Sequence, residues 1–162
     1  MSPKLPSELR AGDIILYRPS SLIDWIIAIK SWTKVSHCEI YAGEGRSYAS
    51  RNGIGVNDYP LRHDHIAAIR RPLHEFDFSA ARVWFYAKAI GQKYDWKGLL
   101  CFVLAVKQGT KDRMFCSEFA TRFYNRGQFQ PFDPNWDADR VPPSFFLVTP
   151  LLETIWQDGD LF

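Results

Sequence analysis

The sequence predicts an α+β protein in which a small antiparallel sheet packs with helices. Short alternating segments separated by turn residues fill positions 36–71, as is typical of a β-meander. After Pro72 the apolar residues recur at helical spacing in longer segments. The chain has 162 residues, of which 46% are hydrophobic and 15% aromatic, enough for one buried core. We therefore expect a single domain over residues 1–162, with the sheet arranged as a meander or a partly closed barrel.

In the first half, a strand that ends at Arg18-Pro19 precedes an amphipathic helix. Ser20 or Ser21 can cap this helix, and its apolar residues recur every three or four positions. The strands that follow alternate between apolar and polar residues, with a turn signal at Glu44-Gly45. The expected strands are 12–19, 37–43, 46–52, 54–59 and 65–71, and the helix is 20–32.

In the second half, helices are expected before and after an apolar segment. Gly91 ends one helix and Gly127 ends another, whose buried stripe would contain Phe119, Ala120, Phe123 and Tyr124. A loop rich in Pro and Asp and an apolar closing segment complete the chain. The expected helices are 77–92, 96–109 and 114–127, the loop is 130–143 and the closing segment is 144–156.

Composition argues against several classes of function. A net charge of +2 gives no strong attraction for nucleic acid. Three cysteines without a CxxC motif or a Cys/His quartet make neither a disulfide framework nor a structural zinc site, so we expect no metal and no cofactor. The apolar runs are too short to span a bilayer, and the first residues lack a signal peptide. We expect a cytoplasmic protein as encoded, unless a phage or secretion machine delivers it.

Cys116 is the candidate nucleophile, because it stands where the helix 114–127 should begin. The unpaired amides and the dipole of a helix N-terminus stabilise a thiolate, which is the reactive form of cysteine. The alternative is a buried cysteine that only packs. Cys101, within an apolar segment, is expected in the core.

His37 is the candidate base for this thiol. It begins an apolar strand, so its ring would stand near the end of the sheet, whereas His63, His65 and His74 lie in polar, loop-like segments. The alternative is a structural histidine on a strand. Its neighbour Cys38 should point to the opposite face and pack as a small apolar residue.

A group that orients the imidazole is also expected, and the hairpin register decides which residue it is. With Glu44 and Gly45 as a two-residue loop, Gly43 faces Arg46. The residues that would then share one face are His37, Glu39, Ser50 and Asn52. A three-residue loop would shift the register and bring Ala49 or Arg51 to that face instead.

Four segments together resemble the circularly permuted branch of the NlpC-type papain-like cysteine hydrolases, which includes relatives of lecithin:retinol acyltransferase. The resemblance covers residues 11–125, and the histidine strand precedes the cysteine helix, as in the permuted branch. The segments are "AGDIILYRP", "SHCEIYAGEGR", "GQKYDWKG" and "FCSEFATRFY".

The resemblance implies a nucleophilic Cys116, a general base at His37 and, at Tyr94, a donor to the oxyanion. Tyr94 has a plain alternative as an aromatic residue packed beside Trp96. The third polar residue of the family falls about twelve positions after the histidine, where this chain has Ala49. The remaining candidates to orient the base are Ser50 and Glu39, which we favour, and Asn52; the site could also work as a dyad.

The sequence therefore predicts a cysteine hydrolase or acyltransferase that acts on an amide, ester or thioester through an acyl-enzyme. The resemblance implies a peptidase or amidase acting on peptidoglycan peptides, or an enzyme acting on lipid acyl groups. A lipid substrate would allow membrane contact, although no basic amphipathic helix demands it. Two alternatives remain: a non-catalytic binding or structural module on the same fold, and a metal site built from His37, Cys38 and either His63 or His65.

Overall fold

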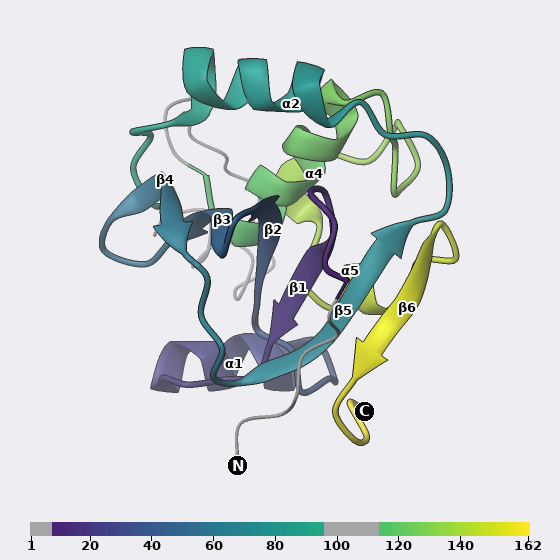
Figure 1. The fold of residues 1–162 in the computed structure, drawn as a ribbon. Coiled ribbons are helices and arrows are strands. Elements are labelled where there is room, and N and C mark those ends of the chain that lie inside the picture. The colour runs from purple at the N-terminus through teal and green to yellow at the C-terminus, as the bar shows by residue number, and fades with distance from the viewer. Residues whose placement is uncertain (1–7, 96–113) are drawn as a thin grey trace.

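The protein has an α+β fold built on one six-stranded antiparallel sheet (Figure 1), as the sequence predicts. The computed structural model describes residues 8–95 and 114–162. The strand order is β4-β3-β2-β1-β5-β6, and among the described residues the outer strands β4 and β6 do not close the sheet into a barrel. The strands are β1 Ile14–Tyr17, β2 His37–Gly43, β3 Arg46–Arg51, β4 Gly55–Pro60, β5 Ile66–Pro72 and β6 Leu152–Gln157.

The helices begin and end close to the expected positions. Ser21 caps α1 in a capping box with Asp24, and Asp77 caps α2. Helix α2 continues as a π-helical turn over Phe85–Ala89, which ends before Gly91. The expected helix 96–109, with Cys101, lies outside the described residues. The α-helices are α1 Leu22–Lys30, α2 Phe78–Trp84, α4 Cys116–Arg126 and α5 Phe145–Val148, and a short 3₁₀ helix spans Ala138–Arg140.

The closing segment, for which the sequence predicts only an apolar stretch, begins as a short helix and ends as a strand. Pro150 follows α5 and cannot donate a backbone hydrogen bond, so the helix stops and the chain turns. The residues after it pair with β5 as the edge strand β6, with Pro72 opposite Leu152. Alternation in "LETIWQ" is the signal that indicates this strand.

An aromatic core lies between the sheet and the helices α2 and α4, which cover the same side of it (Figure 1). Tyr48 of β3 stacks on Phe85 with ring centroids 4.1 Å apart, and Phe119 and Phe123 of α4 pack around them. All four residues of the predicted stripe of α4 are buried. This packing fixes the axis of α4, and so the position of its first residue, against the sheet.

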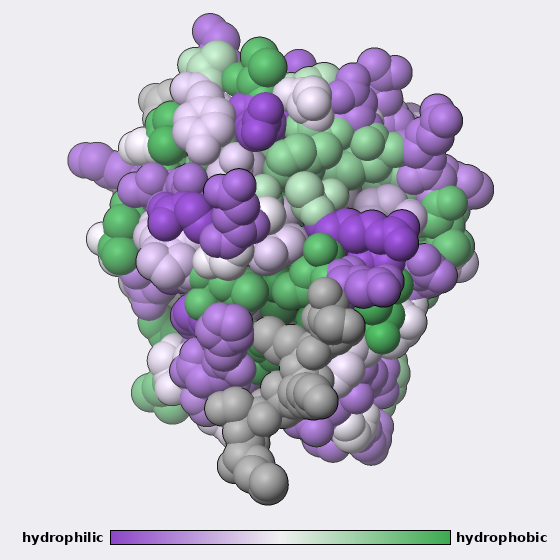
Figure 2. All heavy atoms as spheres, in the orientation of Figure 1, coloured by the Kyte–Doolittle hydropathy of each residue, from purple (hydrophilic) through white to green (hydrophobic). Residues whose placement is uncertain are grey.

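Charged and apolar residues are interspersed on the face in Figure 2. Inside the fold, one arginine is buried: the guanidinium of Arg70 on β5 donates to the backbone oxygens of Phe146, Leu147, Thr149 and Leu152. Burial lowers the pKa of Arg70, and the four carbonyl oxygens accept from its two terminal nitrogens, whereas its Nε has no hydrogen-bond partner among the described residues. The arginine thus joins the end of α5 and the start of β6 to the sheet.

Candidate active site

Cys116 is the first residue of α4 and is almost fully buried, with 3% of its surface exposed. Its sulfur accepts hydrogen bonds from the Cys38 thiol, from the Cys38 backbone N–H and from the His37 ring. The Cys38 thiol is the main cause that lowers the pKa of Cys116 well below its ordinary value; the charge of His37 adds to it, and burial opposes it. The surroundings of this sulfur therefore favour the thiolate.

His37 is the first residue of β2 and lies between two anionic groups. Its Nε2 donates to Oε1 of Glu39 over 3.1 Å, which leaves Nδ1 for the Cys116 sulfur. Burial acts to lower the pKa of His37, but the Cys116 thiolate and the Glu39 carboxylate outweigh it and raise the pKa to about 9. These opposite shifts of pKa favour a thiolate–imidazolium pair.

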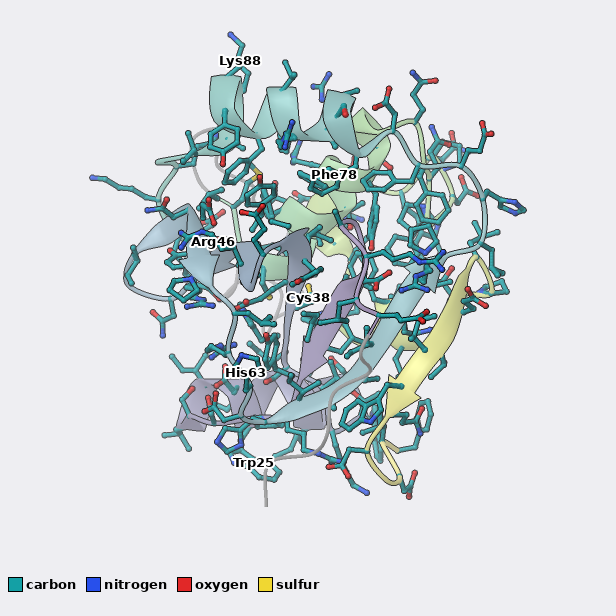
Figure 3. The ribbon with its side chains drawn as sticks, in the orientation of Figure 1. Trp25, Cys38, Arg46, His63, Phe78 and Lys88 are labelled. Atoms are coloured by element: carbon teal, nitrogen blue, oxygen red, sulfur yellow. The ribbon has the colours of Figure 1, made fainter. Side chains whose placement is uncertain are left out.

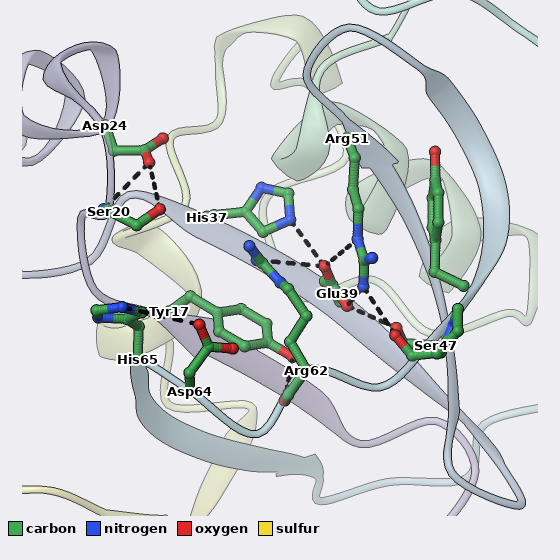
Figure 4. Close-up of polar contacts among 12 residues, drawn as sticks. Tyr17, Ser20, Asp24, His37, Glu39, Ser47, Arg51, Arg62, Asp64 and His65 are labelled. Carbon is green, nitrogen blue, oxygen red and sulfur yellow. Dashed lines mark hydrogen bonds and ion pairs between the residues drawn. The ribbon is translucent and has the colours of Figure 1, made fainter.

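Glu39 is completely buried, yet it remains ionised because donors surround its carboxylate (Figure 4). Arg51 donates to both oxygens, at 2.8 and 3.0 Å, and the Ser47 hydroxyl donates to Oε2 at 2.5 Å. Arg62 approaches Oε1 to 3.4 Å. Burial acts to raise the pKa of Glu39, but the hydrogen bonds from His37 and Arg51 outweigh it and hold the pKa far below its usual range.

The register of the β2–β3 hairpin explains why Glu39, and not Ser50, orients His37. Gly43 faces Arg46, as a two-residue loop requires, but a bulge follows, and from there Tyr41 pairs with Ser47. Continued along the strands, this register puts Ala49 opposite Glu39 and Arg51 opposite His37. Arg51 therefore reaches the carboxylate, as in the shifted register considered above.

Ser50 consequently points to the other face of the sheet, so its expected position beside His37 is wrong. The Ser50 hydroxyl is buried and donates to the backbone oxygen of Met114 over 2.5 Å. Met114 stands two residues before Cys116. Ser50 thus fixes the segment that leads into Cys116 rather than the base.

Cys38 is buried on the face opposite His37, as strand alternation predicts, and Figure 3 shows it in the interior. It does more than pack, however, because α4 covers this face and brings Cys116 to its thiol. Burial, followed by the hydrogen bond to Cys116, raises the pKa of Cys38, so it stays a neutral donor. Sequence spacing gives no signal for this contact, which depends on how α4 packs.

Tyr94 also lies near the nucleophile. The chain before it pairs with β4, where the Val56 N–H donates to the oxygen of Gln92 over 2.8 Å. Its ring packs with Ile27 and Phe115, and burial, together with the charge of Cys116, raises its pKa. Tyr94 is therefore a buried aromatic residue whose hydroxyl feels the charge of Cys116, and its part in binding an oxyanion stays a prediction.

The remaining candidate residues are Asn52, His63 and His65. Asn52 is exposed and lines a cavity of about 250 Å³ beside His37. His63 and His65 are both exposed, and Figure 3 shows His63 away from Cys38. In the described ranges, no three His, Cys, Asp or Glu side chains gather as metal ligands, so the expected combination of His37, Cys38 and His63 or His65 is not formed.

Comparison with known proteins finds a similar fold but no matching family. No family model matches the chain, and no curated protein matches it. The crystal structure of the metalloprotein YiiX from Escherichia coli O157:H7, of the family DUF1105, superposes with a TM-score of 0.68 at 17% identity. The match covers 92% of this chain and 97% of YiiX, and at this identity it shows a shared fold alone.

Within residues 8–95 and 114–162, every helix is too short or too polar to cross a membrane.

Proposed function

We propose that this protein is a cysteine hydrolase or acyltransferase of the permuted papain-like type, with Cys116, His37 and Glu39 as its triad. The observation that carries the proposal is the chain of hydrogen bonds from Cys116 through His37 to a buried, ionised Glu39. A nucleophile, a base and a group that orients the base are the parts of a catalytic triad. The thiol stands at a helix start, and the base stands at a strand start.

The chemistry follows from these positions. The Cys116 thiolate attacks a carbonyl carbon, and His37 gives its proton to the leaving amine, alcohol or thiol. An acyl-enzyme remains, and His37 then takes a proton from water or another acceptor that attacks it. Charge on the carbonyl oxygen is stabilised by the Cys116 backbone N–H, which has no acceptor within its helix, and by the Tyr94 hydroxyl. No step requires a cofactor.

The substrate is an amide, ester or thioester, with a peptidoglycan peptide or a lipid acyl group as the two classes that the resemblance suggests. Membrane contact belongs to the second class. The alternative function, a binding module on the same fold, would explain why Ala49 stands at the position of the third polar residue. The chain has another polar group for this role, because the Glu39 carboxylate accepts a hydrogen bond from His37, two residues earlier on the same strand.

The direct test is to trap the acyl-enzyme with a small activated ester such as p-nitrophenyl acetate. We expect a burst of p-nitrophenolate and an added acetyl group on the Cys116 peptide, found by mass spectrometry. Cys116→Ala should abolish both, and His37→Ala should slow them by about 100-fold or more. Cys101→Ala is the matched control and should react like the wild type. An acetyl group on Cys38 or Cys101 in place of Cys116 would favour the binding module.

A further inference from the structure

The cavity beside His37 carries three arginines from three different parts of the chain. Arg18 follows β1, Arg51 ends β3, and Arg62 lies between β4 and β5. In Figure 4 the guanidinium groups of Arg51 and Arg62 lie on either side of Glu39, near the imidazole of His37. The cavity of about 250 Å³ is thus a basic site next to the proposed base.

The two arginines nearest His37 are not neutralised one for one. Glu39 is the carboxylate that both Arg51 and Arg62 approach, and its two oxygens are already occupied by four donor groups. One negative charge therefore stands against two guanidinium groups and a histidine of raised pKa. Among these groups a net positive charge remains, even when the Cys116 thiolate is counted.

Asp24 and Asp158 also lie near the cavity, and both offset positive charge there. Asp24 lines the cavity, and its carboxylate accepts from Ser20 and Ser21 and closes the capping box of α1. Asp158 lies 3.5 Å from Arg18, and its side chain is 55% exposed, so water screens the pair. Asp158 therefore offsets only part of the positive charge of Arg18 that acts in the cavity.

The arginines differ in how far their existing contacts leave the guanidinium group free to bind a ligand. Arg51 is held by Glu39 and by the backbone oxygen of Pro60, so its role is to hold the carboxylate. Arg62 lies over the Tyr17 ring with 35% of its side chain exposed, and its Nε is buried without a hydrogen-bond partner among the described residues. The exposed part of the Arg62 side chain lines the cavity and favours a ligand with acceptor oxygens.

We propose that this cavity binds an anionic group of the substrate, a carboxylate or a phosphate, through Arg62 and Arg18. The inference rests on the proposed function, in which Cys116 is the nucleophile beside this cavity. It narrows the substrate class to acyl compounds that carry a negative charge close to the bond that is cleaved. The shared chemistry is an oxyanion with two or more acceptor oxygens, which guanidinium groups bind well.

Two alkylating reagents of similar size, one anionic and one neutral, test this inference without a known substrate. Iodoacetate carries the anion, and iodoacetamide does not. The readout is the ratio of their rates at Cys116, compared with the same ratio for Cys116 in the urea-unfolded protein. At low ionic strength we expect the folded protein to favour iodoacetate by about three- to tenfold over the unfolded reference, the effect of a unit charge at a partly solvated site.

Substitutions then assign the effect to the cavity. Arg62→Gln and Arg18→Gln should each move the ratio toward the unfolded value, whereas Arg62→Lys keeps the charge and should retain most of it. Arg46→Gln is the matched control, because Arg46 pairs with Asp58 outside the cavity, and it should leave the ratio unchanged. A ratio equal to the unfolded value, or one that Arg46→Gln lowers as much as Arg62→Gln, overturns the inference.

Competition distinguishes the two sources of the anion. Inorganic phosphate or acetate is added during alkylation by iodoacetamide, with sodium chloride at equal ionic strength as the reference. Selective protection by phosphate assigns a phosphate group, and protection by acetate assigns a carboxylate. If Cys116 reacts with both reagents no faster than Cys38 or Cys101, the proposed function fails. If it is fast but indifferent to charge, only the anion inference fails.

Discussion

The Nε2 atom of His37 lies 3.1 Å from Oε1 of Glu39, two residues further along β2. Side chains two positions apart share one face of a strand, so one short segment supplies both the base and the group that orients it. Ala49, on the next strand, therefore needs no polar side chain. What Glu39 requires instead is a set of donors that keep it charged while buried, and Arg51 and Ser47 provide them.

Glu39→Gln should weaken the thiolate–imidazolium pair. An amide does not stabilise the imidazolium by charge, so the pKa of His37 falls and the pKa of Cys116 rises. We expect alkylation of Cys116 by iodoacetamide to slow by about tenfold at pH 6, with little change at pH 10, where the thiolate forms regardless. The measurement is the rate as a function of pH.

The control for this substitution is Glu44→Gln, in the exposed hairpin loop. Its pH profile should match that of the wild type. An unchanged profile in Glu39→Gln would instead show that Glu39 does not act on the charge of His37.

Cys38→Ala should raise the pKa of Cys116, because the thiolate loses the hydrogen bond that contributes most to its stabilisation. Hydrogen bonds to charged groups contribute about 1.5–3 kcal/mol, and a thiol is a weak donor, so alkylation at pH 6 should slow by about tenfold. Cys38→Ser keeps a donor and should restore much of the rate. Equal rates in the alanine and serine variants would show that Cys38 acts by packing alone.

Much of the site can be predicted from the sequence, because its main parts are local. The strand that begins at His37 and the helix that begins at Cys116 follow from alternation and from helical spacing, and the structure brings both residues together. Glu39 follows from the same alternation.

The other features of the site depend on tertiary geometry. A bulge between Tyr41 and Gly43 shifts the register by one residue and turns Ser50 away from His37, and the alternation of residues in the hairpin does not predict it. The contact between Cys38 and Cys116 exists because the aromatic core seats α4 on that face of the sheet. Such contacts join segments distant in the sequence, and local patterns do not specify them.

Ser50→Ala should affect the approach to the nucleophile and not the base. It removes the hydrogen bond to the oxygen of Met114 and leaves that buried carbonyl without this donor, at a cost of about 1–3 kcal/mol of unfolding free energy. The alkylation rate of Cys116 should fall modestly at every pH, with the shape of the pH profile retained. Urea unfolding and alkylation check the two parts. A shifted profile would return Ser50 to the role that the sequence suggested.

The buried carboxylate of Glu39 should make the fold sensitive to acid. Its pKa is lower in the folded than in the unfolded protein, where an ordinary glutamate titrates near 4.3, so the charged form contributes stability above about pH 4.3. This contribution is lost progressively as the pH falls toward the folded pKa, because the unfolded chain then binds a proton that the folded chain does not.

The Glu39→Gln variant lacks this contribution at every pH and leaves Arg51 without its carboxylate. In urea unfolding we expect the variant to be less stable than the wild type at pH 7 and the difference to shrink between pH 5 and pH 3. A constant difference over this range would contradict an ionised Glu39 in the folded protein.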